Sequence, residues 1–263
     1  MWDSSGTYYE YSRKSSNAPI VFVHGVGLDH KSWRYLLDDF SSNTTLTYDL
    51  LGHGQTKRSL NSQSFRPFME QLDVLLDELN ISEINLVGFS LGGLVAAHYA
   101  ASKSQTVRAF VLISTVYQRT SAEKQAIAIR VRQAKEGDWT GLRTAALSRW
   151  FSPEFLEANP SIRQDILFRL QENKPDDFLE CYELLANSDE HRLEYRDISM
   201  PTLILTGDGD QGSTPGMARR MARAIPNARA SVLRNARHLC IIENHRAISV
   251  HTSRFLKKMA RQR

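Results

Sequence analysis

The nine residues 86–94, Leu-Val-Gly-Phe-Ser-Leu-Gly-Gly-Leu, constrain the fold more than any other stretch. They place a G-x-S-x-G turn between an apolar run typical of a buried strand and an Ala-rich run typical of a helix. A sharp strand-to-helix turn exposes a serine hydroxyl beside the positive end of the helix. We expect Gly88 and Gly92 where strand and helix backbones approach too closely for a side chain. The pattern predicts Ser90 as a nucleophile.

A second glycine-rich turn precedes it. Residues 20–23, Ile-Val-Phe-Val, are continuously apolar, which is typical of a strand covered on both faces and favours a parallel sheet. His24-Gly25-Val26-Gly27 follows directly, at the strand end where ligands of open α/β sheets gather. We interpret it as an oxyanion-hole loop, with a simple tight turn as the alternative. The predicted donors are the backbone N–H groups of Val26 and Leu91.

Strand-like and helix-like segments alternate along most of the chain. The predicted strands are residues 7–12, 20–23, 45–48, 84–87, 107–113, 202–206 and 230–233. This alternation predicts an α/β fold with a mostly parallel, doubly wound sheet. From residue 115 to residue 196, apolar residues fall at helical intervals and no strand pattern interrupts them. We therefore expect a helical cap, 115–196, over a core formed by residues 1–114 and 197–263. Such a cap excludes water and shapes a pocket.

Two late strands each end in a loop that carries a candidate partner for Ser90. Gly207-Asp208-Gly209-Asp210 follows the first, and His238 follows the second. A serine hydroxyl must lose its proton to a base as it attacks, and an acid must hold the tautomer of that base. His238 is the predicted base. From position alone, both Asp208 and Asp210 can serve as the acid.

Other polar groups near strand ends have simpler interpretations. Asp49 and His53 lie in a glycine-punctuated loop, and we expect them to hold it together by hydrogen bonds rather than to contact substrate. Cys240 lies two residues from His238, and we interpret it as a buried thiol that acts as a small hydrophobic group.

These motifs resemble those of the α/β-hydrolase family, and the resemblance covers nearly the whole chain. The order serine, aspartate, histidine is that of the family, and the family's G-x-x-D acid loop implies Asp210 as the acid. The chain looks most like the 3-oxoadipate enol-lactonases and related carboxylic ester hydrolases, whose R-W-F-T-P segment is similar to residues 149–153, Arg-Trp-Phe-Ser-Pro. In two departures, Gln211 replaces a frequent proline and Arg237 replaces the usual glycine before the histidine. The Arg237 cation implies an altered pocket entrance.

Arginines in the first half of the predicted cap are candidates for substrate binding. An arginine that faces inward would form a charge-assisted pair with a substrate carboxylate. Taken singly, each is more typical of a solvated surface. The resemblance and the flanking aromatic residues single out Arg149, with Trp150 as an apolar wall. The cap arginines considered are Arg119, Arg130, Arg132, Arg143 and Arg149.

The sequence therefore predicts a cofactor-free serine hydrolase that cleaves an ester or enol-lactone bond of a small, carboxylate-bearing molecule through an acyl-enzyme. Two alternatives stay open: a C–C or amide bond hydrolase of unsaturated dicarboxylates on the same triad, and a ligand-sensing receptor that retains the fold. A receptor would stall after about one equivalent of product. Dehalogenase chemistry is disfavoured because it needs a carboxylate where Ser90 stands.

Composition narrows the class of protein. Of 263 residues, 41% are hydrophobic and 24% charged, which is ordinary globular material. The formal net charge is +4, and we interpret the dense basic run 254–263 as the exposed face of a last helix, not as a nucleic-acid arm. We see no signal-peptide pattern and no apolar run near the about 18 residues of a membrane span, so we expect a cytoplasmic protein with neither membrane nor nucleic-acid partners. The two cysteines lack metal-ligand spacing, and no metal or cofactor is expected. Oligomeric state is not indicated.

Overall fold

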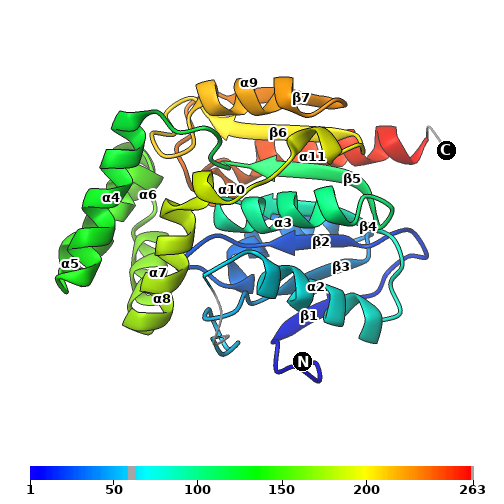
Figure 1. Ribbon diagram of the computed structural model, residues 1–263, viewed down its shortest axis with the longest axis horizontal. Helices are drawn as coiled ribbons and strands as arrows, with labels where there is room; N and C mark the ends of the chain where they lie inside the picture. The colour runs from blue at the N-terminus through cyan, green and yellow to red at the C-terminus, as the bar shows by residue number, and fades with distance from the viewer. Residues whose placement is uncertain (59–62, 262–263) are drawn as a thin grey trace.

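The computed structural model describes residues 1–58 and 63–261, which form a seven-stranded sheet with helices on both faces (Figure 1). The strand order is β1-β3-β2-β4-β5-β6-β7. β1 pairs antiparallel with β3, whereas the other strand pairs are parallel. The predicted doubly wound, mostly parallel sheet is confirmed. The strands are β1 (Tyr9–Ser12), β2 (Ile20–Val23), β3 (Thr45–Tyr48), β4 (Ile84–Phe89), β5 (Val107–Ile113), β6 (Thr202–Gly207) and β7 (Ala228–Leu233).

Helices cover both faces of the sheet and its carboxyl edge. The α-helices are α1 (Arg34–Leu37), α2 (Arg66–Glu78), α3 (Leu91–Ser102), α4 (Ser121–Lys135), α5 (Trp139–Trp150), α6 (Pro153–Ala158), α7 (Pro160–Gln171), α8 (Pro175–Ala186), α9 (Pro215–Ala224), α10 (Cys240–Glu243) and α11 (His245–Ala260). The 3-10 turns are η1 (His30–Trp33), η2 (Asp38–Phe40), η3 (Ser188–Glu190) and η4 (Tyr195–Asp197).

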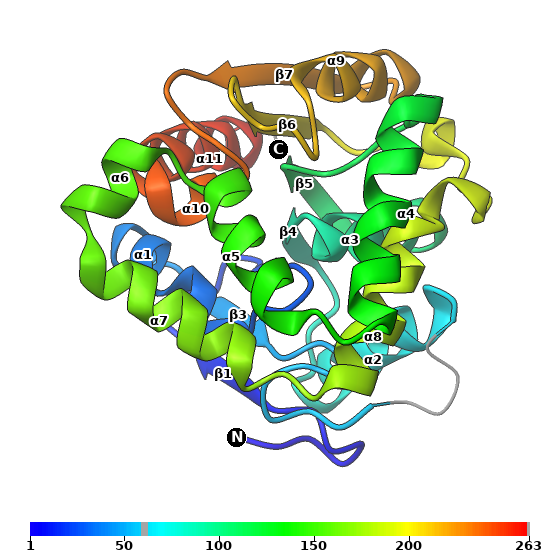
Figure 2. The same ribbon diagram turned by 90° about the vertical axis from the view of Figure 1, so that its left-hand side faces the viewer.

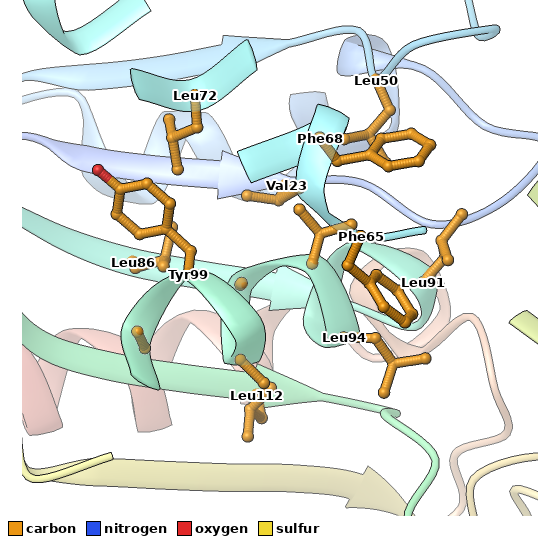
Figure 3. Packing of buried hydrophobic residues seen from close by; sticks show 14 of the residues in the cluster. Val23, Leu50, Phe65, Phe68, Leu72, Leu86, Leu91, Leu94, Tyr99 and Leu112 are labelled. Atoms are coloured by element: carbon orange, nitrogen blue, oxygen red, sulfur yellow. The ribbon is translucent and has the colours of Figure 1, made fainter. Parts of the chain in front are cut away.

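The apolar strand β2 is buried on both faces, as its sequence predicts. Val21 and Val23 belong to the cluster formed with α2 and α3, whereas Ile20 and Phe22 belong to the cluster formed with η1, α1 and α11. Figure 3 shows side chains of α2 and α3 gathered against those of the strands. Because successive strand side chains point to opposite faces, one four-residue run contributes to both cores.

One predicted helix changes between 3-10 and α geometry along its length. The sequence indicates a helix from Asp29 to about Phe40, but this segment is divided into η1, α1 and η2. Asp29 caps it as expected, since the Lys31 N–H donates to its carboxylate. The backbone stays right-handed helical at both junctions, so the segment is one helical run with 3-10 turns at its two ends, where such turns are frequent.

The helices α4 to α8 stand over the carboxyl ends of the strands, at the left of Figure 1. Figure 2 faces this end and shows α5 and α7 on one side, with α4 and α8 on the other. α4 packs against α8, and α5 packs against α7. These five helices lie within residues 115–196, the segment that the sequence predicts as a cap.

The last helix, α11, carries much of the basic run 254–263. Arg254, Lys257 and Lys258 are exposed, as the sequence interpretation expects, whereas residues 262–263 lie outside the described residues. Within the part of the chain that the structure describes, no helix has both the length and the apolar character that crossing a bilayer requires.

Candidate active site

Ser90 occupies a strained turn between β4 and α3. Its φ of 52° lies in the left-handed region that side chains rarely adopt, at a cost of about 1–3 kcal/mol. Its N–H donates to the Ile113 carbonyl at 3.0 Å, which holds the turn against β5. A Cβ on Gly92 would overlap the Val23 and His24 carbonyl oxygens, and one on Gly88 would lie 2.6 Å from the Gly92 oxygen. The two glycines therefore permit the close backbone approach that the sequence predicts.

The structure brings Ser90, His238 and Asp210 together in one hydrogen-bonded chain. His238 Nε2 lies 3.2 Å from Ser90 Oγ, and Nδ1 lies 2.9 Å from Asp210 Oδ2. Asp210 Oδ1 accepts from the N–H groups of Gly212, at 2.9 Å, and Ser213, at 2.8 Å. A carboxylate fixed in this way favours a proton on Nδ1, which leaves the Nε2 lone pair facing the serine hydroxyl.

The other candidate acid lies elsewhere. Asp208 is exposed, and its carboxylate accepts from the Ala236 N–H at 3.3 Å. Of the two aspartates that position left open, only Asp210 contacts His238 in the described structure. The geometry therefore favours the choice that the family resemblance implies.

The proposed oxyanion donors flank the Ser90 turn. Leu91 is the first residue of α3, so its N–H has no acceptor within the helix. Across residues 1–58 and 63–261, neither the Val26 nor the Leu91 N–H donates a hydrogen bond. A Cβ on Gly25 would lie 2.9 Å from the Phe89 ring, so the loop packs tightly on the turn. Both N–H groups are thus available to an oxygen atom bound beside Ser90.

The sequence does not predict one contact, which joins the helical segment 115–196 to the His24–Gly27 loop. Asn173, just beyond α7, donates through Nδ2 to the Gly27 carbonyl at 2.9 Å. Arg169 donates to Asn173 Oδ1 at 2.7 Å and pairs with Asp29 at 3.4 Å, so residues 27–29 are tied to the end of α7. An asparagine after a helix predicts only a turn or a cap, and the chain carries no signal for this partner.

A cavity of about 350 Å³ opens above Ser90 and His238 and extends under the cap helices. Trp150 lines it, with its ring centroid 6.4 Å from that of His238. Its size and apolar lining suit a small molecule. The lining apolar residues include Val26, Leu28, Phe89, Val116, Ile127, Trp139, Leu142, Leu170, Phe178 and Leu185.

The cap arginines separate into different roles. Arg130, Arg143 and Arg149 line the cavity and are partly buried, whereas Arg132 is exposed and outside the lining. Arg119 also reaches the lining, but the expectation of a solvated residue is wrong there: it is 7% exposed. Its guanidinium donates to the Asp189 carboxylate at 2.9 Å and to a cap carbonyl oxygen at 2.8 Å. Arg119 therefore holds the cap together and has its charge compensated.

Arg149 has no such compensation. Its guanidinium makes no hydrogen bond or ion pair with any residue that the structure describes. Burial lowers its pKa, and the nearby Arg130 cation lowers it further. Among the described residues, Arg130 donates only to the Tyr182 hydroxyl, at 3.0 Å. Because a partly desolvated cation without a counter-ion is costly, this part of the cavity favours an anionic group.

The loop after β3 behaves as predicted. Asp49 accepts from the His30 N–H at 2.8 Å, its Oδ1 lies 2.7 Å from His30 Nδ1, and its Oδ2 accepts from the Gln55 N–H at 2.8 Å. His24 Nε2 accepts from the Leu50 N–H at 3.0 Å. Neither Asp49 nor His53 belongs to the cavity lining. These groups hold the loops together.

Cys240 is fully buried and outside the cavity lining. Burial raises the pKa of its thiol to about 12, so the group stays protonated at neutral pH. Its interpretation as a small hydrophobic group is consistent with this placement.

Buried neutral histidines make stability depend on pH. Burial lowers the pKa of His24 to about 3, and those of His53 and His98 to about 4, from an ordinary value of 6.5. Below pH 6.5 the unfolded chain binds protons that the folded chain does not, so stability is full above 6.5 and falls toward pH 4. His30 has the opposite effect on stability. Burial lowers its pKa, but Asp49 raises it above its ordinary value, so protonation of His30 favours the folded chain.

We expect the urea midpoint to fall by at least 1 M between pH 7.5 and pH 4.5, because the three lowered groups outweigh His30. Each 1 M fall in the midpoint corresponds to a decrease of about 1–3 kcal/mol in the free energy of unfolding. In His98→Phe the fall should be shallower, since one of the three protonation sites is gone. A midpoint that stays constant or rises as the solution is acidified would contradict this reading. Urea titrations followed by circular dichroism across this range make the measurement.

Comparison with known proteins shows which family this chain belongs to. A family model for the alpha/beta hydrolase fold matches residues 18–245. An (E)-2-((N-methylformamido)methylene)succinate hydrolase from Acinetobacter baylyi is 28% identical over 87% of this chain and 86% of its own length. 3-Oxoadipate enol-lactonase 1 of the same organism is also 28% identical, over 92% of this chain and 90% of its own. The crystal structure of the enol-lactonase from Burkholderia xenovorans superposes with a TM-score of 0.87, at 25% identity, covering 95% of this chain and 96% of that one.

Proposed function

This chain belongs to the alpha/beta hydrolase fold family, and from that premise we propose that it hydrolyses an ester or enol-lactone bond of a small, carboxylate-bearing molecule. The observation that carries the proposal is the set of hydrogen bonds that joins Asp210 to His238 and His238 to Ser90. Ser90 and His238 line the same cavity as Arg149. Relatives that include a 3-oxoadipate enol-lactonase support hydrolysis of this kind.

In the proposed reaction, Ser90 Oγ attacks the substrate carbonyl carbon while His238 Nε2 accepts the hydroxyl proton. The carbonyl oxygen becomes an oxyanion, which the Val26 and Leu91 N–H groups and the positive end of α3 stabilise. His238 then gives the proton to the leaving alcohol or enol, and an acyl-enzyme remains. A water molecule that His238 deprotonates hydrolyses this ester and restores Ser90. Asp210 stabilises the imidazolium in both steps.

We propose that Arg149 binds the substrate carboxylate, with Trp150 as the apolar wall beside it. Both residues end α5 and line the same cavity as Ser90. Burial and the nearby Arg130 cation both lower the pKa of Arg149, and a bound carboxylate would compensate for both effects. A charge-assisted hydrogen bond in such a site contributes about 1.5–3 kcal/mol.

Two esters with the same leaving group test this assignment: p-nitrophenyl butyrate and mono-p-nitrophenyl succinate, which differ in a terminal methyl or carboxylate. We expect Arg149→Met to raise KM for the succinate ester about 10- to 100-fold and to change KM for the butyrate ester less than about threefold. Arg132→Met, which removes an exposed cap arginine outside the cavity, is the matched control. Equal effects of Arg149→Met on both esters would refute anion recognition by Arg149.

A second reaction is favoured by one relative, the succinate hydrolase, whose name contains an N-methylformamido group on a dicarboxylate. The same triad would then cleave an amide of an unsaturated dicarboxylate. Following product through many equivalents of 3-oxoadipate enol-lactone and of such an amide separates the two reactions. Turnover that stops after about one equivalent on every compound would instead support a receptor.

A further inference from the structure

We propose that Arg237 and Glu243 form a latch that holds the end of α5 against the His238 loop, and that Arg237 thereby sets the position of Arg149 relative to the reacting atoms. Arg237 is then a specificity-determining positioning residue that does not touch substrate. The inference rests on the proposed function, since it assumes that Arg149 binds a substrate carboxylate.

The Arg237 side chain points at the carboxyl end of α5. Its Nη1 donates to the Ser148 carbonyl, and to the Phe151 carbonyl at 3.2 Å. The last carbonyls of a helix lack intrahelical partners and carry the negative end of its dipole, so a guanidinium is well suited to them. Arg237, which the resemblance implies alters the pocket entrance, is absent from the cavity lining. Its side-chain hydrogen bonds reach the pocket through α5.

Glu243 joins the same two segments from the other side. Its Oε1 accepts from the Ser152 N–H at 2.7 Å, and its Oε2 accepts from the Arg237 N–H at 2.7 Å. A further backbone bond runs from the Leu239 N–H to the Trp150 carbonyl at 3.0 Å. The residues on both sides of His238 are therefore bonded to the end of α5.

The latch brackets the residues proposed to bind substrate. Arg149 and Trp150 lie between Ser148 and Phe151, whose carbonyls Arg237 binds. The anion-binding guanidinium and the catalytic imidazole are thus held on one hydrogen-bonded frame. Since a displacement of about 1 Å can cost 100-fold in rate, a frame of this kind couples recognition of the carboxylate to the reaction at the carbonyl.

Arg237→Met tests the latch, because methionine keeps an extended apolar stem but donates no hydrogen bond. We expect kcat/KM for mono-p-nitrophenyl succinate to fall about tenfold, and that for p-nitrophenyl butyrate to fall less than about twofold. Arg237→Lys, which retains a cationic donor but lacks the forked guanidinium, should recover part of the loss. Arg234→Met removes an exposed arginine from the same loop, and it should leave kcat/KM unchanged for both substrates.

A double-mutant cycle with Arg149→Met distinguishes positioning from general damage. If Arg237 acts through Arg149, adding Arg237→Met to Arg149→Met should cause no further loss on the succinate ester. Losses that multiply, or equal losses on both esters, would overturn the latch while leaving the proposed function intact. If Arg149→Met affects both esters equally, anion recognition fails, and the latch fails with it. Should Arg237→Met not fold, as judged by thermal unfolding, the same cycle with Arg237→Lys decides.

Discussion

Replacing Ser90 with alanine is expected to lower kcat about a millionfold for both p-nitrophenyl esters, with little change in KM. The hydroxyl is the proposed nucleophile, and its loss leaves only the oxyanion donors and the binding cavity, whose residual acceleration over water is about 10³ to 10⁴. Ser90 Oγ contacts His238 but supports no other described group, so the fold should persist.

Steady-state release of p-nitrophenol measures this loss. Ser102→Ala is the matched control, because Ser102 ends the same helix, is exposed, and makes a local hydrogen bond to the Tyr99 carbonyl. We expect this control to retain full activity. A Ser90→Ala enzyme within about tenfold of the wild type would show that the hydroxyl is not the nucleophile.

Asp210→Asn is expected to lower kcat about 10⁴-fold. The two N–H groups of Gly212 and Ser213 point at one side-chain oxygen and would hold the asparagine carbonyl there, so its NH₂ group would face His238 Nδ1. An NH₂ donor requires an unprotonated Nδ1, and the proton moves to Nε2, where it blocks deprotonation of Ser90. The fold and the substrate cavity should be unchanged.

The neighbouring Asp208→Asn supplies the control for Asp210→Asn. Asp208 is exposed and, within residues 1–58 and 63–261, accepts only from a backbone N–H, so its variant should keep activity within about threefold. Comparing kcat of the two variants on p-nitrophenyl butyrate makes the test. The opposite ranking would assign the acid to Asp208.

The sequence predicts the sheet and the turn at Ser90 because local residue patterns determine both. The apolar run 20–23 has no solvent-facing position, and its burial on both faces follows from that composition. The turn at Ser90 needs glycines at 88 and 92, because a side chain at either position would overlap neighbouring backbone atoms. Even the choice of His238 follows from its place after a late strand, since parallel strands present their carboxyl ends at one edge.

Contacts between the cap and the core could not be predicted, because each depends on which side chains the tertiary fold brings together. Five cap arginines look alike in sequence, yet Arg119 is buried against Asp189, 70 residues away along the chain, whereas Arg149 has no counter-ion among the described residues. Asn173 contacts Gly27 because the fold brings the end of α7 to the loop after β2. Arg237 stands out in sequence as a departure from the family pattern, but its partners on α5 do not.

Mass spectrometry of the protein quenched during turnover of p-nitrophenyl butyrate examines the proposed mechanism itself. We expect a butyryl group on the peptide that contains Ser90, transient in the wild type and longer-lived in Asp210→Asn, where hydrolysis of the acyl-enzyme also lacks an effective base. Ser90→Ala should carry none. Two results would contradict an acyl-enzyme at Ser90. One is turnover with no butyryl group on Ser90 in either the wild type or Asp210→Asn. The other is a butyryl group on a different residue whose replacement abolishes activity.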